Sequence, residues 1–437
     1  MQGKHIKVGV GLSSQEDTKK CVEEAIKNSM ADGDIKKPRF AFLFVHDSYN
    51  PYEVAEVANA HFGKDWVGTS ADSQFNNKDG YIQKAIQAIV LDTDHMHFGV
   101  GYKEDYKENP QRSGEEAIKM ALDKVHSDKI VDPYIQFRRA QTKSYNEIVK
   151  TPPYFIIDFS TGVEVVDGVM VPGMENEFLE GIFNVTGSHL PIVGQACSSD
   201  LDTFLHKNQT NLFLFADGKV LRHAALVVFV ISNLHFSTNL ANGYLMSNRV
   251  ALATKLSPDG HKLEELNGKP ALVEYSRLLD VDKEIVRKDP FKYTFEHPIG
   301  VIDTDGSLYI KEWMPFPDND AMNVLMRLAP NSAITIVDYD QEKTINTIKE
   351  GIISAAEKAH ATLDQGAISF VFDCCGRKAI IGQEINKEVD AAKKAHPALK
   401  VVGMHTFGEI GTVQNRQAQT VNQSVSLFVI YDKLLTE

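Results

Sequence analysis

The sequence contains little cysteine for its length of 437 residues. Its four cysteines, Cys21, Cys197, Cys374 and Cys375, are too few for a disulfide framework, and none belongs to a Cys-x-x-Cys pair. Such a composition is typical of a reducing compartment. We therefore expect a cytoplasmic protein.

The sequence also lacks a long hydrophobic run. The longest strongly apolar stretch, residues 224–231, is far shorter than the roughly 18 residues that cross a bilayer. Residues 1–14 do not contain the apolar segment of a signal peptide. We therefore expect no insertion into a membrane.

Basic residues are fewer than acidic ones. The chain has 46 lysines and arginines against 59 aspartates and glutamates, which gives a net charge of -13. This negative charge opposes attraction to phosphate backbones. We expect no nucleic-acid partner.

A repeated order of elements stands out in what the sequence does contain. Short runs rich in Val, Ile and Phe predict buried strands, and longer segments with apolar residues every three to four positions predict helices. A strand, a helix and a second strand follow one another three times, over residues 40–75, 154–202 and 367–411. A further apolar strand follows each time, over residues 85–92, 224–232 and 424–432.

These repeats indicate an α/β protein of two domains. A single β-α-β-β unit cannot cover its own apolar faces, so we expect the units to form mixed sheets covered by helices. Residues 1–250 contain two related units, and residues 251–437 contain the third. Between them, residues 242–279 predict two short strands with turns at Asp259-Gly260 and Asn267-Gly268, followed by a helix.

The second strand of each unit ends on Val-Gly followed by small or polar residues. These residues include Thr69 and Ser70 in the first unit, Gln195 in the second and His405 in the third. The carboxyl ends of strands in α/β sheets are common ligand sites. We expect the three ends to occupy equivalent places and to converge on one pocket.

The third unit carries charged residues that suit a ligand. Glu409 stands between Gly408 and Gly411, where a carboxylate could accept hydrogen bonds from an ammonium or hydroxyl group and glycine lets the backbone approach closely. A guanidinium binds a carboxylate through two hydrogen bonds, so Arg377 and Glu409 together suit an α-amino acid. The alternatives are that Glu409 caps a turn, or that the two side chains pair with each other.

Several of these stretches resemble the FIST family, whose members consist of a FIST N and a FIST C part. The resemblance runs from about residue 35 to residue 432, and its C-terminal motifs are the most specific. DCCGR is similar to the family's Cys-x-Gly-Arg element, and GMHTFGEIG is similar to its Gly-Glu-Ile element. The residues that these motifs and the asparagine before the last strand place in a ligand site are Cys374, Gly376, Arg377, His405, Gly408, Glu409 and Asn422.

The resemblance implies a cytoplasmic sensor of a small ligand such as an amino acid, acting in signal transduction together with output domains. Because the sequence shows no kinase, cyclase, DNA-binding or membrane segment, we expect the output to pass through a separate protein. Because some relatives bind haem, it also implies haem as a candidate cofactor, with His405 or His297 as axial ligand. His405 replaces an aromatic residue of the family. VGQAC at residues 193–197 replaces a glycine-rich VGG.

Three further motifs are weaker candidates for sites. His95 and His97 would project from one face of a strand and could hold a metal, but no third ligand is evident. VGVGLSS, residues 8–14, lacks the third glycine of a dinucleotide fingerprint, and a strand leading into a capped helix explains it. A thiol near an arginine can be reactive, but buried cysteines such as Cys374 and Cys375 most often pack.

The rival function is an enzyme, a hydrolase or a transferase, that uses Glu409 as general base. Such an enzyme needs a nucleophile and a base within reach of one another, and the sequence displays no such set. An adaptor would instead expose a large apolar patch. Sensing of a small ligand is the function that the sequence favours.

Overall fold

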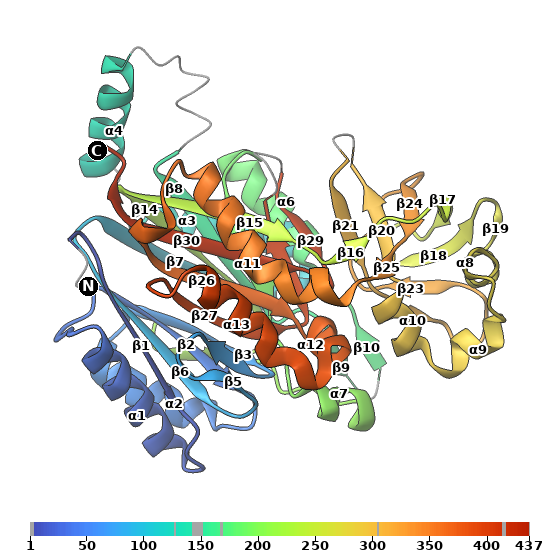
Figure 1. Ribbon diagram of the computed structural model, residues 1–437, viewed down its shortest axis with the longest axis horizontal. Coiled ribbons are helices and arrows are strands. Elements are labelled where there is room, and N and C mark those ends of the chain that lie inside the picture. The colour runs from blue at the N-terminus through green and yellow to red at the C-terminus, as the bar shows by residue number, and fades with distance from the viewer. Residues whose placement is uncertain are drawn as a thin grey trace.

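The computed structural model describes residues 4–125, 128–141, 152–166, 169–303, 306–412 and 417–436. In Figure 1 a larger part holds three sheets with helices packed outside them, and a smaller part, coloured yellow to orange, lies beside it. Over these ranges, no helix combines the length and the hydrophobicity needed to cross a membrane.

The first sheet contains the strands of the first unit. Its six strands follow the order β1-β6-β2-β3-β12-β13, with β2 and β3 parallel. Helices α1 and α2 belong to this unit, and α1 packs on β1 and β6. The bounds are β1 (Lys7–Ser13), α1 (Thr18–Asp32), β2 (Phe40–His46), α2 (Pro51–Phe62), β3 (Trp66–Ala71), β6 (Ile86–Asp92), β12 (Leu214–Ala216) and β13 (Lys219–Leu221).

The second sheet is built in the same way around the second unit. Its order is β7-β14-β8-β11-β28-β29, with β8 and β11 parallel. Helix α3 packs on β7, and α6 packs on α3. The bounds are β7 (Met96–Glu104), α3 (Pro110–Leu122), β8 (Tyr154–Ser160), α6 (Glu175–Thr186), β11 (Ile192–Ala196), β14 (Ala224–Ser232), β28 (Gly408–Gly411) and β29 (Gln419–Val421).

The third sheet contains the strands of the third unit. Its order is β15-β30-β26-β27-β4-β5, with β26 and β27 parallel. Helix α11 packs on β15 and β30, and α13 packs on α11. The bounds are β4 (Gln74–Asn76), β5 (Gly80–Ile82), β15 (Leu234–Ala241), α11 (Gln341–Lys358), β26 (Gly366–Cys374), α13 (Ile385–Ala395), β27 (Lys400–Thr406) and β30 (Val425–Leu434).

Each sheet is completed by a hairpin that belongs to another unit. The hairpin β12-β13 of the second unit pairs with β3 of the first, and β28-β29 of the third unit pairs with β11 of the second. The hairpin β4-β5 of the first unit in turn pairs with β27 of the third. We call this arrangement the hairpin exchange, and it makes every unit depend on a neighbour for one sheet edge.

Close packing between strands explains the recurrent Val-Gly pairs. A Cβ atom at Gly68, Gly194 or Gly403 would lie 2.7, 1.8 or 2.7 Å, respectively, from a carbonyl oxygen of the adjacent parallel strand. A side chain at these positions would push the paired strands apart. The three glycines occupy the same place in the three sheets.

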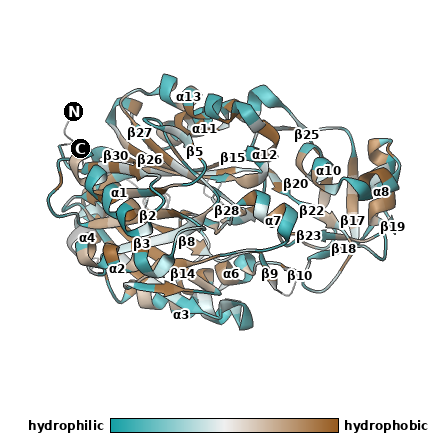
Figure 2. Ribbon diagram, turned by 90° about the horizontal axis from the view of Figure 1, so that it is seen from below, coloured by the Kyte–Doolittle hydropathy of each residue, from teal (hydrophilic) through white to brown (hydrophobic). Residues whose placement is uncertain are grey.

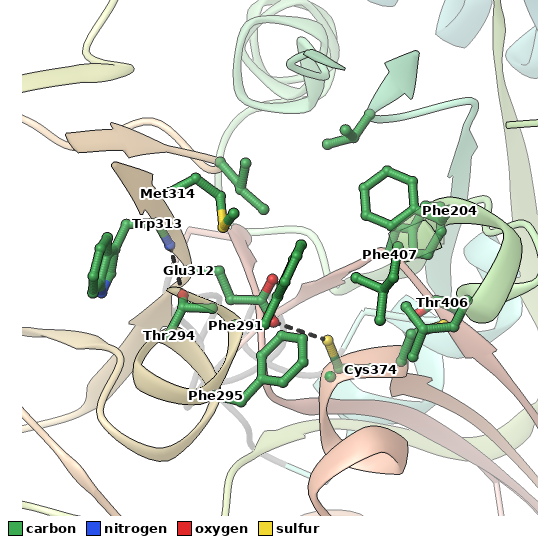
Figure 3. A pocket seen from close by; sticks show the side chains of 16 residues that line it. Phe204, Phe291, Thr294, Phe295, Glu312, Trp313, Met314, Cys374, Thr406 and Phe407 are labelled. Carbon is green, nitrogen blue, oxygen red and sulfur yellow. Dashed lines mark hydrogen bonds between the residues drawn. The ribbon is translucent and has the colours of Figure 1, made fainter. Parts of the chain in front are cut away.

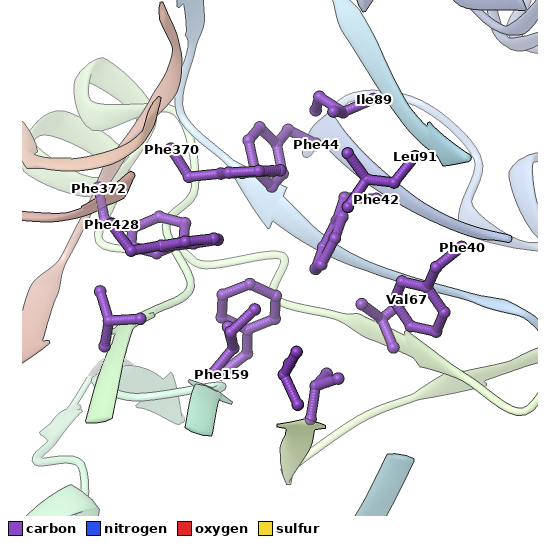
Figure 4. Close-up of a cluster of buried hydrophobic side chains, with 14 of the residues drawn as sticks. Phe40, Phe42, Phe44, Val67, Ile89, Leu91, Phe159, Phe370, Phe372 and Phe428 are labelled. Carbon is purple, nitrogen blue, oxygen red and sulfur yellow. The ribbon is translucent and has the colours of Figure 1, made fainter. Parts of the chain in front are cut away.

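Phenylalanine rings fill the space where the three sheets meet. Phe44, Phe159 and Phe372 hold equivalent positions, each opposite the residue that follows the Val-Gly glycine. The ring of Phe372 lies edge-to-face with both others, at centroid distances of 6.3 Å to Phe44 and 5.5 Å to Phe159. Figure 4 shows these rings together with Phe42 and Phe370. Hydrophilic residues gather on the peripheral helices, such as α1, α3 and α13, in Figure 2.

Glycines also set the contact between β1 and α1. A Cβ atom at Gly9 would lie 1.9 Å from the carbonyl oxygen of Ser29 in α1, and one at Gly11 would lie 2.2 Å from that of Ala25. The glycines of VGVGLSS therefore let the helix pack directly on the strand. The helix that follows is capped by Asp17, whose side chain accepts a hydrogen bond from the backbone N–H of Lys20.

Residues 250–336 form the smaller part of the molecule, which we call the insert. Its eight-stranded sheet has the order β21-β20-β24-β17-β18-β23-β22, with β19 paired to β18. The bounds are β17 (Val250–Leu256), β18 (Lys262–Leu266), β19 (Lys269–Pro270), α8 (Ala271–Leu279), α9 (Lys283–Lys288), α10 (Pro290–Glu296), β20 (Ile299–Ile302), β21 (Leu308–Lys311), β22 (Trp313–Pro315), β23 (Met322–Val324) and β24 (Ala333–Ile336).

The strands, turns and helix predicted within residues 242–279 are found in the structure. β17 and β18 flank the turn at Asp259-Gly260, and β18 and β19 flank Asn267-Gly268, before α8 begins. Gly260, Asn267 and Gly268 have φ angles of 76°, 52° and 72°, a region that glycine and asparagine enter most easily.

Four short strands and one helix lie outside these four sheets. β16 and β25 pair where the insert joins the larger part, and β9 and β10 form a separate ladder. Their bounds are α4 (Asp128–Ala140), β9 (Glu164–Val166), β10 (Val169–Val171), β16 (Tyr244–Leu245) and β25 (Asp338–Tyr339). The fold is an α/β fold of mixed sheets covered by helices, as the sequence predicts.

Candidate functional site

Two parallel strands of the third unit end side by side. β26 ends at Cys374, directly before helix α12 (Cys375–Ile381), and β27 ends at Thr406. Cys374 lies opposite Thr406 in the ladder. The two motifs that carry the family resemblance therefore reach the same sheet edge, because the carboxyl ends of parallel strands coincide.

A cavity of about 40 Å³ lies at this edge. We call it the aromatic cavity, because phenylalanine rings from three parts of the chain surround it (Figure 3). The described lining residues are Val163, Leu201, Phe204 and Leu205 of the second unit, Phe291, Thr294, Phe295, Glu312, Trp313, Met314 and Leu325 of the insert, and Cys374, Cys375, Gly376, Thr406 and Phe407 of the third unit. The cavity thus lies at the junction of three parts; Leu201, Phe204 and Leu205 come from helix α7 (Leu201–Lys207).

Glu312 is the one ionisable carboxyl among the described residues that line the aromatic cavity. Its Oε1 accepts a hydrogen bond of 2.6 Å from Gln423 Nε2, and Cys374 Sγ lies 3.7 Å from the same oxygen (Figure 3). Burial raises the pKa of Glu312 to about 7, against the effect of the bond from Gln423. A ligand that meets Glu312 can therefore decide whether this carboxyl is charged at neutral pH.

Two amide side chains hold the segment of Glu312 in place. Gln423 Oε1 accepts a hydrogen bond of 2.9 Å from the hydroxyl of Tyr244. Asn422 Oδ1 accepts one of 3.1 Å from the backbone N–H of Glu312, and Asn422 Nδ2 donates one of 3.3 Å to the carbonyl of Phe407. Asn422 thus links two backbone segments of the cavity wall.

Glu409 lies behind the wall of the aromatic cavity. Its Oε1 accepts a hydrogen bond of 2.8 Å from Thr406 Oγ1, and its Oε2 accepts one of 3.2 Å from the backbone N–H of Ser424. Burial raises the pKa of Glu409 well above its usual value, and the nearby carboxyls of Asp373 and Glu312 add to this rise. Glu409 is fully buried and is absent from the wall of the aromatic cavity, so it would not contact a ligand bound there.

The partners of Arg377 differ from the one that the sequence suggested. Its guanidinium donates to Asp373 Oδ1 at 2.5 Å, to the carboxylate of Glu388, and to the carbonyl of Thr344 at 3.1 Å. Arg377 is fully buried and is absent from the wall of the aromatic cavity. The prediction that Arg377 pairs with Glu409 is therefore wrong, because the guanidinium pairs with carboxylates on β26 and α13.

Glycine is required where the motif approaches Glu312. A Cβ atom at Gly376 would lie 1.9 Å from Gln423 Nε2 and 2.7 Å from Glu312 Oε1. A Cβ atom at Gly408 would lie 2.3 Å from Met326 Cε, the flexible end of a side chain. The first of these glycines makes room for the hydrogen-bond network, and the second makes room for the insert.

The Val-Gly ends of the first two units meet in a separate polar cluster. Gln195 Nε2 donates a hydrogen bond of 2.9 Å to Thr69 Oγ1, which lies 3.0 Å from Cys197 Sγ. Ser70 Oγ accepts one of 3.3 Å from the backbone N–H of Phe213. All of these groups are buried, and none of them lines the aromatic cavity. In the described residues, the three strand ends therefore do not converge on one pocket as expected from the sequence.

The surroundings of His405 do not fit an axial ligand of haem. The ring packs against the rings of Phe75 and Tyr81, at centroid distances of 5.3 and 5.7 Å. Its Nδ1 forms a hydrogen bond of 2.9 Å with Ser73 Oγ, and its Nε2 lies 3.6 Å from Asp373 Oδ2. Burial lowers the pKa of His405 well below its usual value, so the ring is neutral. A haem iron needs an open approach to its histidine, and this ring is buried between Phe75 and Tyr81.

The other candidate histidines also have partners. His297 Nδ1 lies 2.9 Å from Asp338 Oδ1, and His97 Nδ1 lies 3.3 Å from Arg39 Nη2. His95 packs edge-on against another histidine ring at 5.3 Å. Over the described ranges, no group of three or more potential metal ligands comes together.

The adjacent cysteines are thiols rather than thiolates. Burial raises the pKa of both Cys374 and Cys375 well above the usual value of a thiol, and each side chain is almost completely covered. Since the thiolate is the reactive form, these cysteines serve here as part of the cavity wall.

Sequence reasoning missed Glu312 and the rings of the insert. One signal was available, because Lys311 and Glu312 interrupt the otherwise apolar run of residues 308–314, and charged residues in a buried strand are rare. Phe291 and Phe295 stand in a short segment without clear periodicity, so nothing in the sequence placed them beside the third unit.

Comparison with known proteins supports the family resemblance. The FIST N domain matches residues 39–269, and the FIST C domain matches residues 271–412. No curated protein matches the chain. A solved structure of cyanuric acid hydrolase, titled as an evolutionary innovation by structural concatenation, is 9% identical, with a TM-score of 0.34, over 98% of this chain and 99% of that one. A cyanuric acid hydrolase from A. caulinodans is 8% identical, with a TM-score of 0.37, over the same shares.

Proposed function

This chain belongs to the FIST family, and we propose that it senses a small ligand that binds in the aromatic cavity. FIST domains are small-ligand sensory domains of signalling proteins. The observation that carries the proposal is that both C-terminal motifs, through Cys374–Gly376 and Thr406–Phe407, line one cavity together with rings from two other parts of the chain.

The wall of the aromatic cavity defines the chemistry of the ligand. Its rings and aliphatic side chains favour an apolar or aromatic body, and Glu312 supplies one acceptor for an ammonium or a hydroxyl group. No lysine or arginine occurs among its described lining residues, and Arg377 is held by Asp373 and Glu388. An amino acid or a similar metabolite would therefore be recognised by its amino group, which Glu312 binds, and by its apolar side chain, which the rings contact.

Binding at the junction would act on the arrangement of the three parts. A ligand can favour one arrangement only by contacting it better than another, and this cavity takes its walls from α7, the insert and the third unit. A separate output protein would then recognise the favoured arrangement. Because the cavity of about 40 Å³ is smaller than an aromatic amine, binding would also have to widen it, and its effect would be a shift in the packing between domains.

Calorimetry with phenethylamine and phenylacetate tests the ligand chemistry. The amine is expected to bind and the acid is not, because Glu312 attracts the ammonium and repels the carboxylate. Glu312→Gln removes a charged hydrogen bond worth about 1.5–3 kcal/mol, so the affinity for the amine should fall by about 10- to 100-fold. Glu350→Gln, at an exposed position of α11, is the matched control and should bind like the natural protein.

The pH dependence of this binding has a defined sign. Glu312 has a pKa of about 7 in the protein without a ligand. Below pH 7 it must therefore lose a proton before it can pair with an ammonium group. The affinity for phenethylamine should therefore rise about tenfold between about pH 6 and pH 8, with a proton released on binding. Equal binding of the acid and the amine, or an unchanged affinity in Glu312→Gln, would remove the aromatic cavity as the site.

A further inference from the structure

A second, larger cavity lies on the other side of strand β21. It has a volume of about 240 Å³, and we call it the polar cavity. Its walls come from helix α6 of the second unit, from strands β20 and β21 and the stretch 327–332 of the insert, and from residues 417–419 at the start of β29. Lys311 of β21 lines the polar cavity, whereas its neighbour Glu312 lines the aromatic cavity, because successive residues of an extended chain project to opposite sides.

Lys311 is a buried amine with an incomplete set of partners. Its side chain belongs to a residue that is only 4% exposed, and its Nζ donates one hydrogen bond of 2.5 Å to the carbonyl of Thr420. Over the described residues, no carboxylate lies within ion-pair distance of this nitrogen. Burial without a counter-charge lowers the pKa of Lys311 to about 7. Near neutral pH, a large share of this amine is therefore uncharged.

The charges around the polar cavity disfavour an anionic ligand. Arg327 is held by Glu180 Oε1 at 2.8 Å and by Glu177 Oε1 at 3.5 Å, so its positive charge is more than matched by α6. Tyr309 is the other titratable residue on the described wall. The polar amide groups of the wall, such as that of Asn176, suit hydroxyl or carbonyl oxygens. An uncharged ligand with a carbonyl group fits these surroundings better than a carboxylate or a phosphate.

We propose that Lys311 is an attachment site for a small uncharged aldehyde or ketone, which it holds in the polar cavity as an imine. The nitrogen lone pair of the neutral amine adds to the carbonyl carbon, and one proton moves from the nitrogen to the former carbonyl oxygen to give a carbinolamine. Loss of this hydroxyl group as water, with loss of the proton on nitrogen, forms the C=N bond. The step is reversible and requires no oxidant or reductant.

Reductive trapping with propanal and cyanoborohydride at pH 7 tests this proposal. Cyanoborohydride reduces an imine to a stable secondary amine, and peptide mass spectrometry then shows which lysines carry the propyl group. An ordinary surface lysine is neutral in only about one molecule in a thousand at this pH. We expect Lys311 to be labelled at least about tenfold faster than any exposed lysine.

Lys358 is the matched control within the same chain. Burial lowers its pKa as well, and its Nζ donates a hydrogen bond of 2.6 Å to Asn239 Oδ1, but it lines neither the aromatic nor the polar cavity. If Lys311 is labelled no faster than Lys358 in the natural protein, the proposal is overturned, whatever any variant does.

Lys311→Met provides the second arm of the test. Methionine replaces an uncompensated buried charge by an apolar side chain of similar length, so the variant should fold, which a cooperative thermal transition checks. The propyl group should then be lost from the β21 peptide while labelling elsewhere is unchanged. Phenethylamine binding to Glu312 is measured separately, so failure of one site leaves the other site intact.

Discussion

Arg377 ties four elements of the third unit together through one buried guanidinium. It lies in α12, and its partners Asp373, Glu388 and Thr344 lie in β26, α13 and α11. Burial raises the pKa of both partner carboxyls, that of Glu388 well above its usual value. The cluster is stable only while the positive charge is present.

Arg377→Leu should therefore destabilise the fold. Loss of the guanidinium leaves the buried carboxyls without a positive charge beside them. This should lower the free energy of unfolding, measured with urea, by about 3–5 kcal/mol. Arg112→Leu is the control, since Arg112 pairs with Glu116 on an exposed helix surface and its loss should leave the free energy of unfolding nearly unchanged. If Arg377→Leu kept the stability of the natural protein but lost phenethylamine binding, Arg377 would instead be a ligand-binding residue.

Single residues could be predicted from the sequence where the backbone alone decides their position. Cys374 and Gly376 stand at a strand end, and the strand end leads to the aromatic cavity. The direction of Arg377 depends on which charges approach it in three dimensions. One hint was local, because Asp373 and Arg377 are four residues apart, a spacing at which opposite charges often pair.

At the scale of elements, the long apolar strands could be predicted and the exchanged hairpins could not. Strands such as β8 and β26 are mostly apolar runs of seven and nine residues, whereas β4, β12 and β29 have three residues each and no periodicity. The partner of β4 is β27, where Gln74 lies opposite Met404. A contact between positions so far apart leaves no trace in a single sequence.

The glycine of a Val-Gly pair and the glycine of the Gly-Glu-Ile element should differ in their tolerance of alanine. At Gly194 the new Cβ would lie 1.8 Å from the backbone oxygen of Asp158, so β8 and β11 must separate. At Gly408 it would meet the movable end of Met326. We expect Gly194→Ala to cost at least about 2 kcal/mol and Gly408→Ala less than about 1 kcal/mol, measured by thermal unfolding. If both variants were destabilised equally, β8 and β11 could move apart without a large loss of stability.

At the scale of the whole molecule, the hairpin exchange links the three units in a cycle. The second sheet takes β28-β29 from the third unit, and the third sheet takes β15 from the second and β4-β5 from the first. The sequence predicted the three units and the α/β class from repeated strand-helix-strand order. It could not predict the cycle, because the strands of the borrowed hairpins have only three or four residues each.

Residues 1–250 expressed alone should therefore not form a native monomer. This fragment retains β15, β4 and β5 but lacks the central strands β26, β27 and β30 that pair with them, and unpaired strands promote association. Size-exclusion chromatography should show aggregates, and co-expression with residues 251–437 should restore a single species of the full size. A cooperative, monomeric 1–250 fragment would show that the exchanged hairpins add little to stability.

The segment that closes the aromatic cavity is also the start of a borrowed strand. Thr406 and Phe407 line the cavity, and the chain passes from them directly into β28, whose residues hydrogen-bond to β11 of the second unit. A displacement of the Phe407 ring would consequently pull on a sheet to which the third unit does not otherwise belong. Movement of the Phe407 ring would therefore be transmitted along β28 to β11, outside the third unit.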